Sequence, residues 1–243
     1  MKYLKIAFGL ALVAGLMAVV ASPALAAQPK WVACQEVTSG KWTNNNCTTA
    51  GSGKFETKAV TETVEVTSSS PGGLELEDSK ATGGATAIKC EGSDLGTVGN
   101  EGSDSITKIT ATKCTFVKAG SCESGKAATA RALNLPWATK LEEVGKEVRD
   151  QVTSLVSGKE PGWAVECTVL GVFKITDECT GNTSTGIHNV RNEGKVEAVF
   201  DKVTEEKPAT CSVGGAKSGF VRGVDLSLLT RWHLYVLAPA LGG

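Results

Sequence analysis

Apolar and polar residues alternate with a period of two along much of the chain. The three valines of residues 60–66 lie at even positions, and residues 163–169 and 196–200 repeat the alternation. Such a period is typical of antiparallel strands with one buried and one solvated face. Turn-forming residues separate these segments, at Pro71-Gly72-Gly73, Gly83-Gly84, Gly99-Asn100, Pro161-Gly162 and Gly214-Gly215. We therefore predict an all-β protein, an antiparallel β-sandwich or barrel.

One segment, residues 141–156, fits two patterns. Its apolar residues from Leu141 to Leu155 would form one stripe of a helix, with Gly158 in the position of a C-terminal cap. The alternative is a hairpin with its turn at Gly145. A glycine inside a helix costs about 1 kcal/mol, and the valines of this segment suit strands. The balance favours the hairpin.

The N-terminus has the three parts of an export signal. Lys2 and Lys5 precede an uncharged apolar run over residues 6–21, and Ala24-Leu25-Ala26 has the small-residue pattern of a cleavage site. The run is shorter than the roughly 20 residues that span a bilayer. We predict a cleaved signal peptide over residues 1–26, a protein that is secreted or held in the cell envelope, and membrane contact only before cleavage.

The remaining length suits one domain or two small ones. We expect a single secreted β domain, cross-linked by disulfides, over residues 27–225. After Asp225 the composition changes, because four bulky residues arrive between 231 and 235 and no further acidic residue follows. We expect residues 226–243 to be either a last strand or a divergent C-terminal tail.

All eight cysteines lie beyond the signal, and we expect them to form disulfides: Cys34, Cys47, Cys90, Cys114, Cys122, Cys167, Cys179 and Cys211. A zinc site is not indicated, because the chain has no C-x-x-C motif and contains only two histidines. Eight cysteines allow 105 pairings. Proximity along the chain favours Cys34–Cys47, Cys114–Cys122 and Cys167–Cys179, which leaves Cys90–Cys211 as a long-range link.

Composition narrows the classes of function. The formal net charge is −1 at pH 7, and aromatic residues make up 5% of the chain. A near-neutral chain offers no electrostatic basis for binding nucleic acid. The small apolar side chains imply a thin core, to which each disulfide would add about 2–4 kcal/mol.

Three segments together point to a known group of proteins. They are Asn134-Leu135-Pro136-Trp137, Pro161-Gly162-Trp163-Ala164-Val165-Glu166-Cys167 and Ala209-Thr210-Cys211-Ser212-Val213-Gly214-Gly215. With these segments and its Trp31…Cys34 start, the chain resembles an uncharacterised family of secreted, cysteine-containing actinobacterial proteins. The resemblance extends to about Gly223 and implies secretion and an all-β fold. It implies no activity and no catalytic residue.

The sequence offers no catalytic set. The two histidines, His188 and His233, have no G-x-S-x-G nucleophile motif to serve. Asp177 and Glu178 are adjacent, so on a strand they would face opposite sides and could not act on one glycosidic bond. We therefore expect no enzyme and no cofactor.

Two weak binding candidates remain. Asp94, Glu101 and Asp104 lie among glycines in a stretch that could bind calcium as a loop, although a solvated acidic loop is the favoured interpretation. Trp137 follows Pro136, and an exposed ring there could stack on a sugar. We expect a non-enzymatic protein that binds an extracellular protein or glycan or forms a surface structure. A carbohydrate-binding module is the alternative, ahead of a hydrolase with an unrecognised site.

Overall fold

The computed structural model describes residues 28–123, 126–190, 195–200, 207–229 and 233–237. The predicted signal peptide lies outside these residues. Within them the chain forms fifteen strands and one short 3-10 turn, η1 (Asn100–Gly102). The strands are β1 (Lys30–Trp42), β2 (Ala50–Ala59), β3 (Val64–Asp78), β4 (Thr86–Val98), β5 (Ser103–Lys118), β6 (Thr129–Leu133), β7 (Trp137–Val144), β8 (Glu147–Ser154), β9 (Gly162–Val169), β10 (Phe173–Thr180), β11 (Thr183–Val190), β12 (Lys195–Phe200), β13 (Ala209–Cys211), β14 (Gly215–Leu229) and β15 (His233–Leu237). None of the described segments forms a helix of the length and apolarity that crossing a membrane requires.

Eight strands close into an antiparallel barrel. β3, β4, β5, β7, β8, β11, β12 and β14 pair in this order, and β14 pairs back to β3. The order around the barrel follows the order along the chain, with β6, β9, β10 and β13 inserted between barrel strands. The predicted all-β fold is therefore confirmed, and of the two architectures named it is the barrel.

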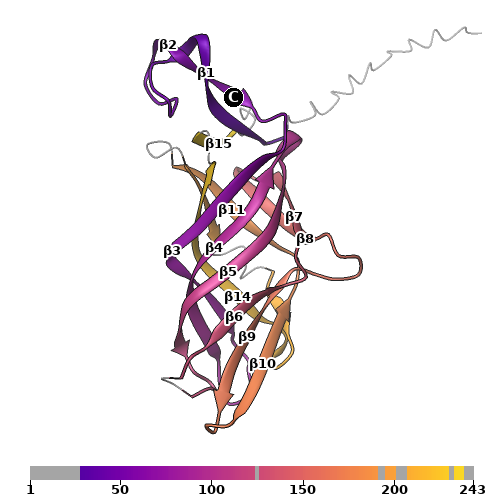
Figure 1. Ribbon diagram of the computed structural model, residues 1–243. Helices are drawn as coiled ribbons and strands as arrows, with labels where there is room; N and C mark the ends of the chain where they lie inside the picture. Colours follow the sequence, from indigo (N-terminus) through magenta and orange to yellow (C-terminus); the bar gives the residue numbers. More distant parts are fainter. Residues whose placement is uncertain (1–27, 124–125, 191–194, 201–206, 230–232, 238–243) are drawn as a thin grey trace, which may run out of the picture.

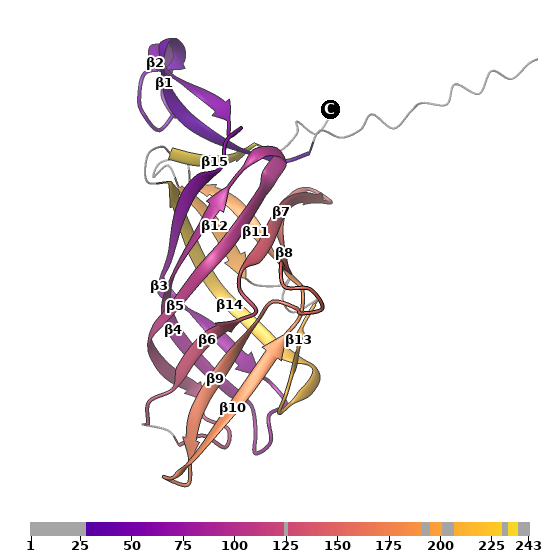
Figure 2. The same cartoon turned by 45° about the vertical axis from the view of Figure 1, so that its right-hand side comes forward.

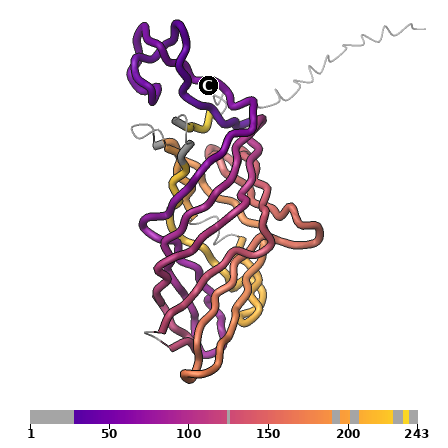
Figure 3. Tube along the Cα trace, in the orientation of Figure 1, coloured from indigo at the N-terminus to yellow at the C-terminus, as the bar shows by residue number. Residues whose placement is uncertain are grey.

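Four long strands carry the sheet beyond this barrel. β3, β4, β5 and β14 each span 13 to 16 residues. β13, β10, β9 and β6 continue the sheet from the far half of β14, and β6 comes back close to β5. The molecule is a long tube with an upper half, the closed barrel, and a lower half that shares these four strands (Figures 1 and 2). Figure 3 lets the reader follow their continuous trace along the tube.

The pairing of β3 changes register where the two halves meet. The shift lies between Ser70 and Leu74, and β14 shifts opposite it. Pro71-Gly72-Gly73, predicted to form a turn, is instead an irregularity within one strand. Pro71 lacks an N–H and Gly73 has a φ of 75°, features that a bulge and a turn share. Gly223 of β14 approaches closely here, since a Cβ on it would lie 2.8 Å from the Gly73 carbonyl oxygen.

A three-stranded sheet caps the upper half. β1 lies between β15 and β2, and Lys30–Cys34 pair with His233–Leu237. Residues 226–229 complete β14, which runs through the boundary expected at residue 225. Of the two possibilities for residues 226–243, the described part is strand.

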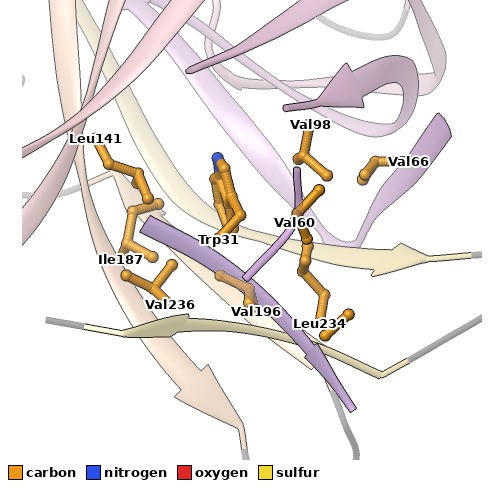
Figure 4. Close-up of a cluster of buried hydrophobic side chains, with 10 residues drawn as sticks. Trp31, Val60, Val66, Val98, Leu141, Ile187, Val196, Leu234 and Val236 are labelled. Carbon is orange, nitrogen blue, oxygen red and sulfur yellow. The ribbon is translucent and has the colours of Figure 1, made fainter. Parts of the chain in front are cut away.

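The cap closes the barrel with apolar side chains. Trp31 of β1 and Leu234 of β15 are 3% and 0% exposed, and they share a core with Leu141, Ile187 and Val196 from the barrel wall (Figure 4). Burial of these groups ties the cap to the upper half. A second core, which includes Trp163, fills the lower half.

All eight cysteines form disulfides, and none is free. The pairs are Cys34–Cys47, Cys90–Cys114, Cys122–Cys167 and Cys179–Cys211. The first is the pair predicted from spacing, and the other three predicted pairs (Cys114–Cys122, Cys167–Cys179 and Cys90–Cys211) are wrong.

Strand pairing, rather than proximity along the chain, decides which cysteines meet. Cys179 of β10 lies directly opposite Cys211 of β13, with their Cα atoms 3.9 Å apart. Cys90 of β4 and Cys114 of the neighbouring β5 have Cα atoms 4.1 Å apart. These two disulfides each join adjacent strands of the lower half.

Residues 141–156 form the hairpin that the sequence favours over a helix. β7 and β8 pair from Trp137 opposite Ser154 to Val144 opposite Glu147. Gly145 adopts a φ of 68° in the turn, a conformation that suits glycine.

A buried carboxylate on β3 pairs with partly exposed cations from two other strands of the lower half. The side chain of Glu77 on β3 is 4% exposed and accepts hydrogen bonds from Lys118 of β5 and Arg222 of β14. Burial acts to raise the pKa of Glu77, but the two bonds outweigh it and hold the pKa below its ordinary value.

Candidate functional site

A partly open cavity of about 230 Å³ lies inside the tube. Trp31, Val66 and Val98 contribute to its apolar wall on the cap side, and Leu76 and Trp163 do so on the side of the lower half. An engineered apolar cavity of about 150 Å³ is large enough to take up benzene. This cavity therefore has room for a small organic molecule.

Four aspartates lie between the two apolar walls, and we call them the acidic belt. They are Asp94 of β4, Asp104 of β5, Asp150 of β8 and Asp225 of β14. Hydroxyl groups line the same cavity, among them those of Ser68, Ser105, Thr183, Thr185 and Ser227. The middle of the cavity is polar, while its ends are apolar.

Strand alternation points these carboxyl groups inward. Asp150 lies between Val148, which packs against the upper core, and Val152, which lines the cavity. On β14, Asp225 and Ser227 line the cavity in the same alternation. Acidic residues thus occupy inward positions that apolar side chains would otherwise fill.

Asp94 and Asp225 form a carboxyl pair. They are hydrogen-bonded to each other, and both interact with Ser68, whose Oγ lies 3.0 Å from Ser227 Oγ. Two ionised carboxylates have no donor between them, so the hydrogen bond between Asp94 and Asp225 requires a proton on one of the two carboxyl groups. Burial, together with repulsion from Asp94, raises the pKa of Asp225 to about 8. Burial also raises the pKa of Asp94, against the effect of its hydrogen bonds.

The other two aspartates have fewer partners. Burial is the main cause that raises the pKa of Asp150 to about 7. Burial, with repulsion from Asp150 and Asp94, holds the pKa of Asp104 well above its ordinary value. Among the described residues, no cation contributes to the pKa shift of any belt aspartate, so no positive charge in this part of the chain offsets the desolvation of these groups.

Several buried polar atoms around the belt have no hydrogen-bond partner among the described residues. They include Oδ1 of Asp104, Oδ1 of Asp150, Oγ1 of Thr183 and Nε1 of Trp31. Trp31 is 3% exposed. Figure 4 shows the Trp31 indole extending away from the cap strand β15, beside Leu141 and Val98. Buried polar groups are nearly always paired, so such a group of exceptions indicates a place for a bound molecule.

The basic side chains among the described lining residues lie at the surface. Arg131 and Lys207 are both exposed. Arg131 is held by Glu178, with Nη2 to Oε1 at 3.0 Å, and by Glu166 at 3.7 Å. Its charge is therefore engaged outside the belt.

The three calcium candidates do not form a common site. Asp94 and Asp104 line the cavity from β4 and β5, whereas Glu101 is exposed in η1 with a φ of 56°. The stretch predicted to be a loop is mostly strand, because β4 runs to Val98 and β5 begins at Ser103. Among the described residues, these three side chains are not a group within reach of one metal ion.

Trp137 lies in the cavity wall rather than on a flat exposed surface. It is half-buried, and its Nε1 donates a hydrogen bond to the Leu133 carbonyl oxygen at 2.8 Å. Trp31 and Trp163 are buried in the two cores. These described tryptophans therefore do not form the planar row that stacking on a glycan would use.

Asp177 and Glu178 face opposite sides of β10, as their adjacency predicts. Asp177 is buried and accepts hydrogen bonds from the Ser212 hydroxyl and the Val213 N–H, each at 3.0 Å, while Glu178 is exposed. Burial raises the pKa of Asp177. Asp177 also lies within metal-binding distance of Cys179 and Cys211, but those two sulfurs are bonded to each other.

Sequence reasoning found half of the acidic belt and misread its setting. The sequence suggests Asp94 and Asp104 as calcium ligands in a loop. It does not suggest Asp150 or Asp225 as site residues. The segment Val148-Arg149-Asp150-Gln151-Val152 carried a usable signal, because its acid falls on the apolar phase of a predicted strand. Asp225 had no comparable signal, because it lies within the register shift of β14 between Arg222 and Leu226.

Fold and site together define a class, a closed antiparallel β-barrel that encloses a small cavity with an acidic middle. The chain matches no protein-family model, no curated protein and no solved structure at a significant level.

Proposed function

We propose that this is an exported, non-enzymatic binding protein that holds one small molecule inside its barrel. The observation that carries the proposal is the capped cavity of about 230 Å³ with unpartnered polar atoms in its wall. Ligand sites are typically apolar cavities with a few polar groups that fix orientation, and eight-stranded barrels can hold one small ligand. The export pattern at the N-terminus and the four disulfides support a location outside the cytoplasm.

The cavity also favours a small ligand over a glycan on the outer surface. The Trp137 indole N–H is bound within the chain, and its ring contributes to the cavity wall. Recognition inside the barrel would involve most of the ligand's surface, because small-molecule cavities typically bury most of the molecule that they hold.

The test has two parts: a search for a molecule already bound in the cavity, and a titration with a small probe before and after the cavity is filled by a larger side chain. Protein recovered from culture medium without denaturation is weighed by native mass spectrometry, and 1-octanol is titrated into it by calorimetry. Ser68 and Ser69 provide matched variants, since Ser68 lines the cavity and Ser69 is exposed. Ser68→Leu is expected to weaken 1-octanol binding at least about tenfold, and Ser69→Leu to leave it unchanged.

A second cavity variant guards against misfolding of the first, because Ser68 also interacts with Ser227. Ala198 lines the cavity from β12, so Ala198→Leu should weaken binding in the same way. A native mass equal to that of the bare chain together with no heat from 1-octanol would overturn the proposal. Unchanged binding in both cavity variants would do so as well.

A further inference from the structure

We propose that the ligand is an organic ammonium ion, a small apolar molecule whose positively charged amine lies in the acidic belt. The inference rests on the proposed binding function and names the chemical class that the cavity selects. It follows from the order of surfaces inside the tube, which runs from apolar wall to carboxyl groups to apolar wall.

The belt offers hydrogen-bond acceptors, and the described residues supply no cation to it. Oδ1 of Asp104 and Oδ1 of Asp150 accept no hydrogen bond from the described residues. An ammonium group carries up to three donors and no acceptor. Buried charges in proteins are nearly always paired. A positively charged amine would therefore supply the hydrogen-bond donors and the opposite charge that these carboxyl oxygens lack.

Other ligand classes fit less well. An anion would meet four carboxyl groups and no described inward cation, so its charge would be buried without a partner of opposite sign. A metal ion takes several oxygen ligands at about 2.0–2.6 Å. Among the described residues, no three belt carboxylates converge to that extent. An ammonium ion needs only one or two carboxylates, and its apolar part can contact the walls.

Binding of a cation should compete with protons. Asp94, Asp104, Asp150 and Asp225 line the cavity from four strands. Asp104 is repelled by Asp150 and Asp94, Asp225 is repelled by Asp94, and Glu142 of β7 repels Asp150. The described inward side chains of β3, β11 and β12 include Ser68, Thr185 and Val196, none of which titrates. With the pKa of Asp150 about 7 and that of Asp225 about 8, an ammonium ion displaces protons from the belt. Its affinity should rise up to about tenfold per pH unit for each proton displaced.

The experiment compares three probes of equal chain length, n-octylamine, 1-octanol and octanoate, on the full oxidised protein. Calorimetric titrations at about pH 5.5, about pH 6.5 and about pH 7.5 are run in two buffers of different ionisation enthalpy, which counts the protons released. Octylamine keeps its charge throughout this range, as a lysine amine does. At about pH 7.5 it is expected to bind at least about tenfold more tightly than 1-octanol, with proton release and a steep pH dependence.

Variants locate the effect. Asp150→Asn and Asp225→Asn should each weaken octylamine binding at least about tenfold while retaining 1-octanol binding, because asparagine keeps the shape and removes the charge. Glu65→Gln is the control, since Glu65 is exposed on β3. Equal or tighter binding of 1-octanol, with octylamine binding unaffected by both belt variants, overturns the ammonium class and leaves the binding function standing. Failure of all three probes, with a bare native mass, overturns the binding function itself.

Discussion

Replacing Asp225 by asparagine is expected to stabilise the protein at neutral pH and to change its stability little near pH 4. Asp225 is a carboxyl group whose pKa is raised from 3.8 to about 8 in the folded state. A carboxyl with a raised pKa must take up a proton on folding whenever the pH lies between these two values. Its contribution is therefore most favourable below the unfolded pKa, and it is lost as pH rises toward the folded pKa.

The magnitude follows from the width of that interval. Each pH unit above the unfolded pKa costs about 1.4 kcal/mol, so a group that stays protonated at pH 7 costs about 4 kcal/mol there. Asparagine keeps a donor for Asp94 and needs no proton. The variant should recover most of this energy at pH 7 and only a small fraction of it at about pH 4.

Guanidinium unfolding with the disulfides intact, followed by circular dichroism and tryptophan fluorescence, measures the effect across this pH range. Glu65→Gln should behave like the parent protein at every pH, because Glu65 is exposed. If Asp225→Asn destabilises the protein equally at both ends of the range, the idea of a protonated carboxyl pair is refuted.

Three further predictions concern the lower half. Peptide mapping under non-reducing conditions should find Cys90 joined to Cys114, and replacing both by alanine should cost about 2–4 kcal/mol of unfolding free energy. Replacing Glu77 by glutamine should cost about 1–3 kcal/mol near pH 7 and much less below about pH 4, because the lowered pKa of Glu77 makes its contribution vanish as pH falls. Gly223→Ala should lower the melting temperature by several degrees, since its φ is 130° and its Cβ would lie 2.8 Å from the Gly73 carbonyl oxygen; an unchanged melting temperature would contradict the close approach.

Local patterns predicted local structure well. The alternation of residues 163–169 and 196–200 marks β9 and β12, and the valines and Gly145 of residues 141–156 favour the hairpin that forms. These features depend on the period of side-chain burial and on the φ angle that a turn requires, and residues close together in the sequence determine both.

Long-range closure was beyond such patterns. Alternation fits a sandwich as well as a barrel, and the distinction depends on β14 pairing with both β3 and β12. The same long-range pairing sets Cys179 opposite Cys211 and gathers four aspartates into one belt. Carboxyl groups in this belt lower the stability of the fold, and the proposed ligand site would be the function that retains them.

The pairing of β1 with β15 sets the order in which the cavity can close during synthesis. β1 can pair with β2 early, but Lys30 lies opposite Leu237, so β1 pairs with β15 only after every strand of the barrel wall has been made. Contacts between such distant residues form late, because a long loop must close before they stabilise anything. The cap is therefore a final step of assembly, and until then the belt remains open to whatever solution surrounds the folding chain.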